Sequence, residues 1–281
     1  MRIEETRETL RRYGVRPKRE LGQSFLIDEM VASRITDAAG LSESETVVEI
    51  GAGLGILTEL LARRAERVIA VEVDARLFKA LRVRLQQLEN LTLLNQDILR
   101  LDFGELLRQE KIGTIKVVGN LPYQITSQIL NCIIENRALI KLAVLTLQDE
   151  VARRVVSAPG KREYGLLSIL VQYYTRPELL FSIKPSCFYP SPRVLSTVVR
   201  LNSRASPPIS VNEELFLRLV KASFSRRRKM LKNALRASFS EDILKRLSVC
   251  SEIDLRRRAE TLSILEFGEL TDGLSRAMRS P

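Results

Sequence analysis

Apolar residues between Thr46 and Gln148 fall into short continuous runs, separated by segments with the spacing of amphipathic helices. The runs "TVVEIG", "RVIAVEVD", "LTLLNQD", "IKVVGN" and "LAVLTLQ" predict strands that are buried on both faces. The segments "ILTELLARRA" and "ARLFKALRVRLQQL" predict helices, as does the pattern after "GNLPY" and the stretch from Asp149. This alternation is typical of a doubly wound α/β domain with a mostly parallel sheet.

The rest of the chain follows a different pattern. The Pro-rich connection "KPSCFYPSPRV" joins two later strands, "ELLFSI" and "STVVRL", so we expect this pair to be antiparallel. The apolar segment "YGLLSILVQYY" is expected to lie in the core. After a linker at 202–209, the sequence shows only helical spacing. We therefore predict a basic N-terminal arm (1–20), an α/β domain (21–201), a linker (202–209) and a small all-α domain (210–281).

Composition excludes several classes of chemistry. The 281-residue chain has no histidine, and its cysteines Cys132, Cys187 and Cys250 show no CxxC spacing. Mechanisms that need imidazole are therefore excluded, and no metal site is expected. The sequence has no apolar run long enough to span a membrane, and its N-terminus lacks the apolar core of a signal peptide. A cytoplasmic protein is expected.

The charge indicates a polyanionic partner, because the formal net charge is +11. Part of the excess lies between Lys221 and Arg236, which enclose a run with no acidic residue. A solvated helix face is one interpretation of such a run. We prefer contacts with RNA phosphates, and the predicted RNA-binding residues are Arg226, Arg227, Arg228, Lys229 and Lys232.

A glycine-rich turn follows the first strand. The segment "EIGAGLGILT" places Gly51, Gly53 and Gly55 between a strand and a helix. Glycines allow a ligand to approach the backbone closely there, and the start of the helix supplies N–H groups without partners. The spacing is GxGxG rather than the GxGxxG of dinucleotide-binding turns, which favours a cofactor without a pyrophosphate.

Acidic residues follow the next two strands. Glu72 ends the second strand, where a carboxylate suits both hydroxyls of a ribose, and Asp97 ends the third, within reach of an adenine edge. Either acid alone is commonly a solvated strand end or a helix cap. Ligands of open α/β sheets bind at the carboxyl ends of the strands, so three successive ends of this kind predict one cofactor site. The pattern fits S-adenosylmethionine.

The fourth strand ends in the tetrad Asn120-Leu121-Pro122-Tyr123. A turn in which Asn caps and Pro interrupts is one interpretation. The functional interpretation is that the Asn120 amide oxygen and the Leu121 carbonyl are two neutral acceptors, the second fixed by Pro122. Two acceptors and the Tyr123 ring match an exocyclic amine on a flat base.

The motifs "EIGAGLG", "VEVD", "NQDI" and "GNLPY" resemble those of class I methyltransferases, in particular the ribosomal RNA adenine N6-dimethyltransferases. The resemblance extends to "LGQSFLID", "FYPSPRV" and "FSRRRKMLKNAL", so it covers nearly the whole chain. It implies a Rossmann-like fold and the branch of the family that dimethylates two adjacent adenosines near the 3′ end of small-subunit rRNA. The implied partner is the small ribosomal subunit or its precursor, bound by a monomer.

The resemblance also implies the residues that bind S-adenosylmethionine. The implied cofactor site comprises Gln23, Ser24, Leu26, Gly51, Gly53, Glu72, Asp97, Ile98 and Asn120. In this site the segment around Ser24 covers the cofactor, Glu72 holds the ribose, and Asp97 with Ile98 contacts the adenine. Ser24 stands where the family commonly has Asn, and Ala52 stands where bacterial members often have Pro. We expect backbone contacts to survive both changes.

For the target adenine, the implied catalytic residues are Asn120, Leu121, Pro122, Tyr123 and Phe188. Asn120 and the Leu121 carbonyl would bind the N6 amine, while Tyr123 and Phe188 would hold the base by stacking. Phe188 alone would more often be a core aromatic residue, but the neighbouring prolines favour an exposed, rigidly held ring. Hydrogen bonds to both amino hydrogens would aim the nitrogen lone pair at the methyl group, so no histidine is required.

Other functions remain open from the sequence. An Erm-type enzyme would perform the same chemistry on large-subunit rRNA, and a non-catalytic assembly factor would use only the basic surface. A nicotinamide-dependent dehydrogenase is disfavoured by the glycine spacing and the absence of histidine. The complete set of Glu72, Asp97 and the tetrad favours an enzyme that acts on the small subunit, with a role in ribosome biogenesis.

Overall fold

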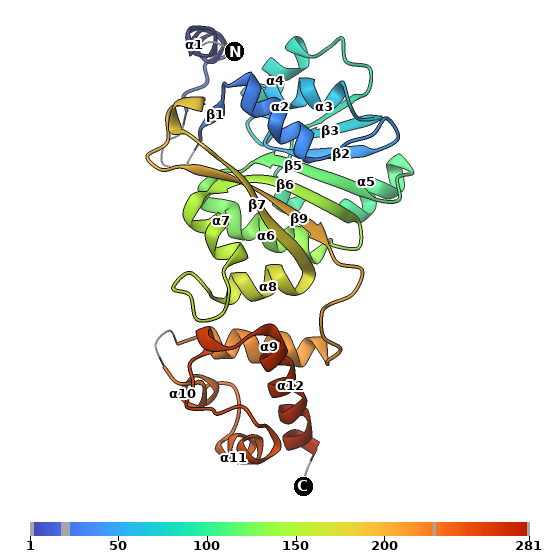
Figure 1. The fold of residues 1–281 in the computed structure, drawn as a ribbon. Helices are drawn as coiled ribbons and strands as arrows, with labels where there is room; N and C mark the ends of the chain where they lie inside the picture. Colours follow the sequence, from blue (N-terminus) through green and yellow to red (C-terminus); the bar gives the residue numbers. More distant parts are fainter. Residues whose placement is uncertain (1–2, 18–22, 227–228, 280–281) are drawn as a thin grey trace. The chain divides into compact units, whose positions relative to one another are not determined.

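The computed structural model describes every residue except 1–2, 18–22, 227–228 and 280–281. The strands of its seven-stranded sheet are β2 (Thr46–Ile50), β3 (Arg67–Val71), β4 (Leu91–Leu94), β5 (Ile115–Asn120), β6 (Ile140–Gln148), β7 (Thr175–Ile183) and β9 (Ser196–Ser203). Their order in space is β4-β3-β2-β5-β6-β9-β7 (Figure 1). The strands from β4 to β6 in this order are parallel, whereas β9 pairs antiparallel with both β6 and β7. The predicted mostly parallel sheet with a late antiparallel pair is confirmed.

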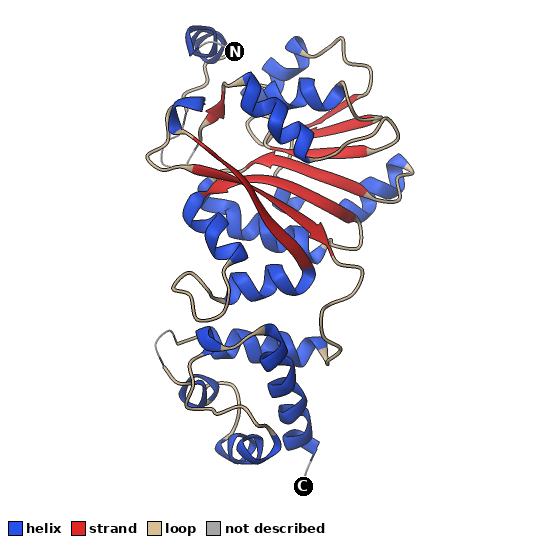
Figure 2. Cartoon of the chain, in the orientation of Figure 1, coloured by secondary structure: helices blue, strands red, loops and turns tan. Residues whose placement is uncertain are grey.

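Both faces of the central strands are covered. Val47 and Val48 of β2 are each 0% exposed, although successive side chains of a strand point to opposite faces. Helices α2 (Glu29–Ala38) and α3 (Ile56–Ala62) lie on one face of the sheet, and α6 (Thr126–Glu135) lies on the other (Figures 1 and 2). Burial on both sides explains why these strands read as continuous apolar runs.

Aspartates fix where two further helices begin. Asp74 and Asp102 accept hydrogen bonds from backbone N–H groups in the first turns of α4 (Ala75–Arg84) and α5 (Phe103–Glu110). Such caps satisfy donors that have no partner within the helix. The turn from each strand into its helix is thereby closed at a defined residue.

A second, two-stranded sheet was not predicted. Strand β1 (Phe25–Leu26) pairs antiparallel with β8 (Phe188–Tyr189), which follows the short helix η4 (Pro185–Cys187). The peptide bond between Tyr189 and Pro190 is cis. Strands of two residues carry no alternation, so sequence periodicity could not reveal them.

Part of the predicted N-terminal arm is helical. Residues Ile3–Arg12 form α1, and Leu10 of this helix packs in a small apolar cluster with Phe25 and Leu54. The Arg76 guanidinium donates a hydrogen bond to the Gly14 carbonyl over 2.6 Å. The described part of the arm is therefore held against the elements that carry the glycine turn.

The chain divides into two compact units. The first comprises residues 1–152 and 175–203, and the second comprises residues 153–174 and 204–281. The second contains α8 (Leu166–Tyr174), α9 (Glu213–Phe224), α10 (Leu231–Leu235), α11 (Glu241–Cys250), the short η5 (Ala259–Thr261) and α12 (Ile264–Arg279), while α7 (Asp149–Val156) spans the division. This division differs from our domain boundaries at 153–174. Within the described ranges, no helix has the length and apolar character needed to cross a membrane.

Aromatic contacts explain why the segment "YGLLSILVQYY" groups with the C-terminal helices. The Tyr173 ring stacks on the Phe216 ring of α9 with centroids 4.4 Å apart. The Tyr174 hydroxyl donates a 2.7 Å hydrogen bond to Glu213 at the start of the same helix. Aromatic pairs of this kind bury a large apolar area, so α8 belongs to the helical core.

Candidate functional site

A pocket lies at the carboxyl ends of β2 and β5, where the strand order reverses direction. This is the position at which open α/β sheets bind their ligands. Of the residues predicted for cofactor and target, those that line the pocket are Gln23, Ser24, Leu26, Gly51, Gly53, Glu72, Asn120, Leu121, Pro122 and Tyr123. Asp97, Ile98 and Phe188 are not among the residues that line it.

The glycine turn requires glycine for two reasons. Gly51, Gly53 and Gly55 have φ values of 73°, 57° and 82°, a region that side chains with a Cβ rarely adopt. A Cβ on Gly55 would also lie 2.8 Å from Leu81 Cδ2. The turn therefore brings the backbone to the pocket and places Gly55 directly before α3.

Glu72 holds this turn from the end of β3. One carboxylate oxygen accepts the Gly53 N–H over 2.8 Å, and the other accepts the Asp74 N–H over 2.9 Å. The residue is only 5% exposed, and burial raises the pKa of its carboxyl while the backbone hydrogen bonds oppose that rise. Each oxygen retains a further lone pair, so the same carboxylate can accept from a ligand hydroxyl.

Asp97 acts as a cap in this structure. Its side chain accepts the Leu99 N–H over 3.0 Å and begins the short helix η2 (Ile98–Arg100). The neighbouring Asn95 donates to the Glu72 carbonyl over 2.7 Å, which ties the ends of β4 and β3 together. The proposed contact of Asp97 and Ile98 with an adenine stays a prediction.

The orientation of the Asn120 amide follows from its partner. Its Nδ2 lies 2.9 Å from the Ser24 carbonyl oxygen, which can only accept a hydrogen bond. The amide nitrogen must therefore face Ser24, and the amide oxygen is left as an acceptor. This is the orientation that binding of an exocyclic amine requires.

The Ser24 side chain contacts the connection before β9. Its hydroxyl donates a 2.6 Å hydrogen bond to the Pro190 carbonyl. Ser24 lines the pocket and connects its own motif with two others that are distant in sequence. Its hydroxyl bonds to the Pro190 carbonyl, and its carbonyl accepts from Asn120.

Tyr123 lies beside the tetrad's acceptors in the short helix η3 (Tyr123–Ile125). The side chain is partly buried, and its hydroxyl lies 2.9 Å from Ser196 Oγ. Burial raises the pKa of Tyr123, and the hydrogen bond with Ser196 opposes that rise only in part.

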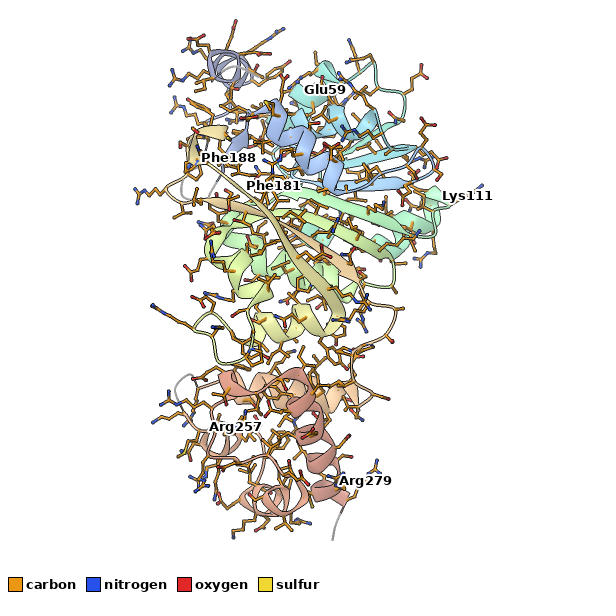
Figure 3. The ribbon with its side chains drawn as sticks, in the orientation of Figure 1. Glu59, Lys111, Phe181, Phe188, Arg257 and Arg279 are labelled. Atoms are coloured by element: carbon orange, nitrogen blue, oxygen red, sulfur yellow. The ribbon has the colours of Figure 1, made fainter. Side chains whose placement is uncertain are left out.

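The expectation of an exposed Phe188 ring is wrong. Phe188 is 3% exposed and belongs to the same apolar cluster as Leu26, Ile183 and Val198. Its place in the fold is marked in Figure 3. The β1–β8 pairing sets Phe188 opposite Leu26 and turns the ring into the core, whereas the proline-rich sequence indicated only a rigid connection. Its stacking role stays a prediction, and it would require the ring to become accessible.

Glu49 is a pocket residue that we did not predict. It lies in β2, is 1% exposed, and accepts a 2.6 Å hydrogen bond from the Thr58 hydroxyl. Burial raises the pKa of Glu49 to about 8, and repulsion from Glu72 adds to the rise. Its position as the one acidic residue inside the apolar run "TVVEIG" could have indicated it from the sequence.

Glu49 should make the stability of the protein depend on pH. Its folded pKa lies above that of the unfolded chain, so its stabilising contribution is complete below about pH 4.5 and is lost as pH rises to about 8. The loss is about 1.4 kcal/mol for each unit by which the two pKa values differ. We expect Glu49→Gln to make the decline of Tm between pH 5.5 and 8.5 shallower, because the raised pKa of Glu72 still contributes a decline. Parallel Tm curves for the two proteins would contradict it.

The predicted RNA-binding residues are described in part. Arg226 and Lys229 are exposed, and with Asn233 and Arg236 they line a surface cavity. Arg227 and Arg228 lie outside the described residues. The run contains no acidic residue in sequence, but in the folded chain an acidic side chain lies beside it.

An acid from the next helix reaches the basic run. Glu241 of α11 forms a 3.1 Å ion pair with Arg236 and lies 3.8 Å from the Lys232 ammonium group. Arg226 and Lys229 are therefore better candidates for phosphate contacts than Lys232. No group of three or more His, Cys, Asp or Glu side chains within the described ranges is placed to hold a metal ion.

Known proteins resemble this chain over nearly its whole length. A family model for ribosomal RNA adenine dimethylase matches residues 14–274. A protein from Alkaliphilus oremlandii named ribosomal RNA small subunit methyltransferase A is 40% identical over 278 residues, with 97% of each chain covered. A protein of the same name from Syntrophus aciditrophicus is 41% identical over 278 residues, covering 96% of this chain and 98% of its own.

Solved structures give a similar result. The 23S rRNA methyltransferase ErmE is 26% identical with a TM-score of 0.69, covering 89% of this chain and 99% of its own. A dimethyladenosine transferase from Plasmodium falciparum has a TM-score of 0.75 and 24% identity, over 90% of this chain and 98% of its own. At that identity the second likeness concerns the fold alone.

Proposed function

This chain belongs to the ribosomal RNA adenine dimethylase family, and on that premise we propose that it methylates N6 of two adjacent adenosines near the 3′ end of small-subunit rRNA. It is an rRNA adenine dimethyltransferase. The relatives named for the small subunit are about 40% identical to it, against 26% for ErmE, which acts on 23S rRNA. This difference supports the small subunit as the substrate and a role in ribosome biogenesis.

S-adenosylmethionine fits the pocket as the methyl donor. The glycine turn offers close backbone approach without a pyrophosphate-binding spacing, and the buried Glu72 carboxylate has free lone pairs for ribose hydroxyls. Glu49 adds a second buried carboxyl on the same side of the sheet end. The cofactor supplies an activated methyl group on a sulfonium.

The orientation of Asn120 is the observation that carries the proposal. Its amide oxygen and the Leu121 carbonyl accept the two N6 hydrogens of the target adenine. These hydrogen bonds favour a pyramidal nitrogen whose lone pair points at the methyl group. The Tyr123 ring stacks against the adenine, since a flipped base is recognised by stacking as well as by hydrogen bonds. The transient ammonium loses its proton readily, so the site needs no imidazole base.

Methyl transfer from labelled S-adenosylmethionine tests this function. The substrates are small subunits from cells that lack the modification, with large subunits from the same cells in a parallel reaction. We expect label in N6-dimethyladenosine of small-subunit rRNA alone. Label only in large-subunit rRNA would establish the Erm-type activity instead. RNA binding with no methylated adenosine in either reaction would establish a non-catalytic assembly factor.

We further propose that residues 210–281 bind rRNA through Arg226 and Lys229. Each phosphate neutralised by a side chain contributes about 0.7–0.9 to the slope of log affinity against log salt. We therefore expect the double variant Arg226→Gln, Lys229→Gln to bind small subunits more weakly, with a slope reduced by up to about 2. The measurement is a filter-binding titration at several salt concentrations.

A matched control removes the same net charge from the same unit. Arg162 and Lys245 are also exposed, and the variant Arg162→Gln, Lys245→Gln should bind nearly as the parent protein does. If both double variants lost the same affinity and slope, net charge rather than the surface around Arg226 would explain the binding.

A further inference from the structure

A single hydrogen bond holds the outer end of the Tyr123 ring. The Tyr123 hydroxyl lies 2.9 Å from Ser196 Oγ, although the two residues are 73 positions apart in sequence. Tyr123 belongs to the one-turn helix η3, which begins after Pro122 and has no side-chain cap. A turn this short fixes the Cβ of the ring but not the direction in which the ring extends.

Ser196 is buried in the central sheet of the α/β unit. Its side chain is 0% exposed, and it is the first residue of β9. In the sheet register Ser196 pairs with Gln148 of β6 on one side and with Ile183 of β7 on the other. Because strands flank it on both sides, its backbone has a fixed position, and its hydroxyl lies 2.9 Å from that of Tyr123, which lines the pocket.

The neighbouring residue strengthens this anchor. The Thr197 hydroxyl donates a 2.8 Å hydrogen bond to Asp149, directly after β6. The Asp149 N–H in turn donates to the Leu195 carbonyl over 3.0 Å. The start of β9 is therefore held on both sides of Ser196 by contacts that do not involve Tyr123.

We propose that Ser196 is a positioning residue that sets the direction of the Tyr123 ring for the target base. The inference rests on the proposed function, in which this ring packs against adenine. A ring held at its Cβ and at its hydroxyl keeps its long axis fixed and retains only rotation about that axis. Without the bond the ring adopts other rotamers, and the N6 amine lies in line with the methyl group less often.

Two substitutions remove the bond from opposite ends while the ring remains. We expect Ser196→Ala and Tyr123→Phe each to lower kcat for methyl transfer to small subunits by roughly 10-fold, the loss of one hydrogen bond in orientation. KM for S-adenosylmethionine should not change, because neither hydroxyl is assigned to the cofactor. The double variant should be no slower than the slower single variant, since both changes remove the same contact.

A purely structural role for Ser196 gives a different result. In that case Ser196→Ala would lower Tm and leave kcat unchanged. The kcat of Tyr123→Phe would then not follow that of Ser196→Ala. Ser182→Ala is the matched control, because Ser182 shares a 3.2 Å hydrogen bond with Thr197 on the adjacent strand and does not contact the Tyr123 hydroxyl. This variant should keep the kcat of the parent protein.

The outcomes separate this inference from the proposed function. If the parent protein methylates small-subunit rRNA and both single variants match its kcat, the role of Ser196 is rejected. If Ser196→Ala does not fold, Tyr123→Phe decides alone, because it leaves the buried serine in place. If the parent protein itself transfers no methyl group to adenine, the proposed function fails.

Discussion

Replacing Asn120 by alanine is expected to lower kcat for methyl transfer by about 100- to 1,000-fold, the range typical of losing one oriented group at a reacting centre. The substitution removes the amide oxygen that accepts an N6 hydrogen. It also removes the hydrogen bond to the Ser24 carbonyl, which fixes that orientation in the protein. Single-turnover methyl transfer to small subunits measures the effect without a contribution from product release.

The binding of the methyl donor should change little in this variant. Calorimetry with S-adenosylmethionine is the companion measurement, and Kd should rise by no more than about threefold. Asn120 is one of several residues of the implied cofactor site, whereas the N6 acceptor that it supplies acts in the transition state. Asn131→Ala is the control, because Asn131 is exposed on α6 and does not line the pocket. A kcat loss of less than about tenfold in Asn120→Ala would contradict the role given to the amide.

Replacing Glu72 by glutamine is expected to weaken S-adenosylmethionine binding by about 10- to 100-fold, because hydrogen bonds to a charged acceptor are each worth about 1.5–3 kcal/mol. The carboxylate accepts N–H groups from Gly53 and from Asp74. Glutamine keeps the size but sets an amide N–H against one of those donors. Where that donor is the Gly53 N–H, the glycine turn loses its hydrogen bond to the end of β3, and the contact with the ribose is weakened as well.

Calorimetric titration measures this loss, and Glu43→Gln provides the control. Glu43 is exposed before β2 and carries the same charge, so its replacement should leave Kd unchanged. Equal affinities for the parent protein and Glu72→Gln would show that the cofactor does not use the end of β3. Circular dichroism of the variant would establish that the sheet has formed.

The architecture of the site could be predicted because parallel strands impose it. The apolar runs that become β2, β3 and β5 required burial on both faces, and the carboxyl ends of such strands meet at one edge. Gly51 and Asn120 are far apart in sequence, yet a Cβ on Gly51 would lie 3.9 Å from the Asn120 carbonyl oxygen. Motif order along the chain was therefore enough to bring these residues together.

Contacts made by short or irregular segments could not be predicted. The burial of Phe188 depends on the pairing of β1 with β8, and these strands have only two residues each. The ion pair between Glu241 and Arg236 depends on the path of the chain between α10 and α11. Counting charges along the sequence does not predict that path. Likewise, the predicted domain boundaries placed Tyr173 in the α/β domain, but its ring stacks on Phe216 of the helical unit.

Sequencing of rRNA at nucleotide resolution tests the central claim most directly. Small and large subunits lacking the modification are incubated in separate reactions with the protein and S-adenosylmethionine, and N6-dimethyladenosine is then mapped along each purified RNA. We predict two adjacent dimethylated adenosines near the 3′ end of small-subunit rRNA, both strongly reduced in an incubation of the same length when Asn120→Ala replaces the parent protein. Dimethyladenosine confined to large-subunit rRNA, or found in neither RNA, would contradict the account.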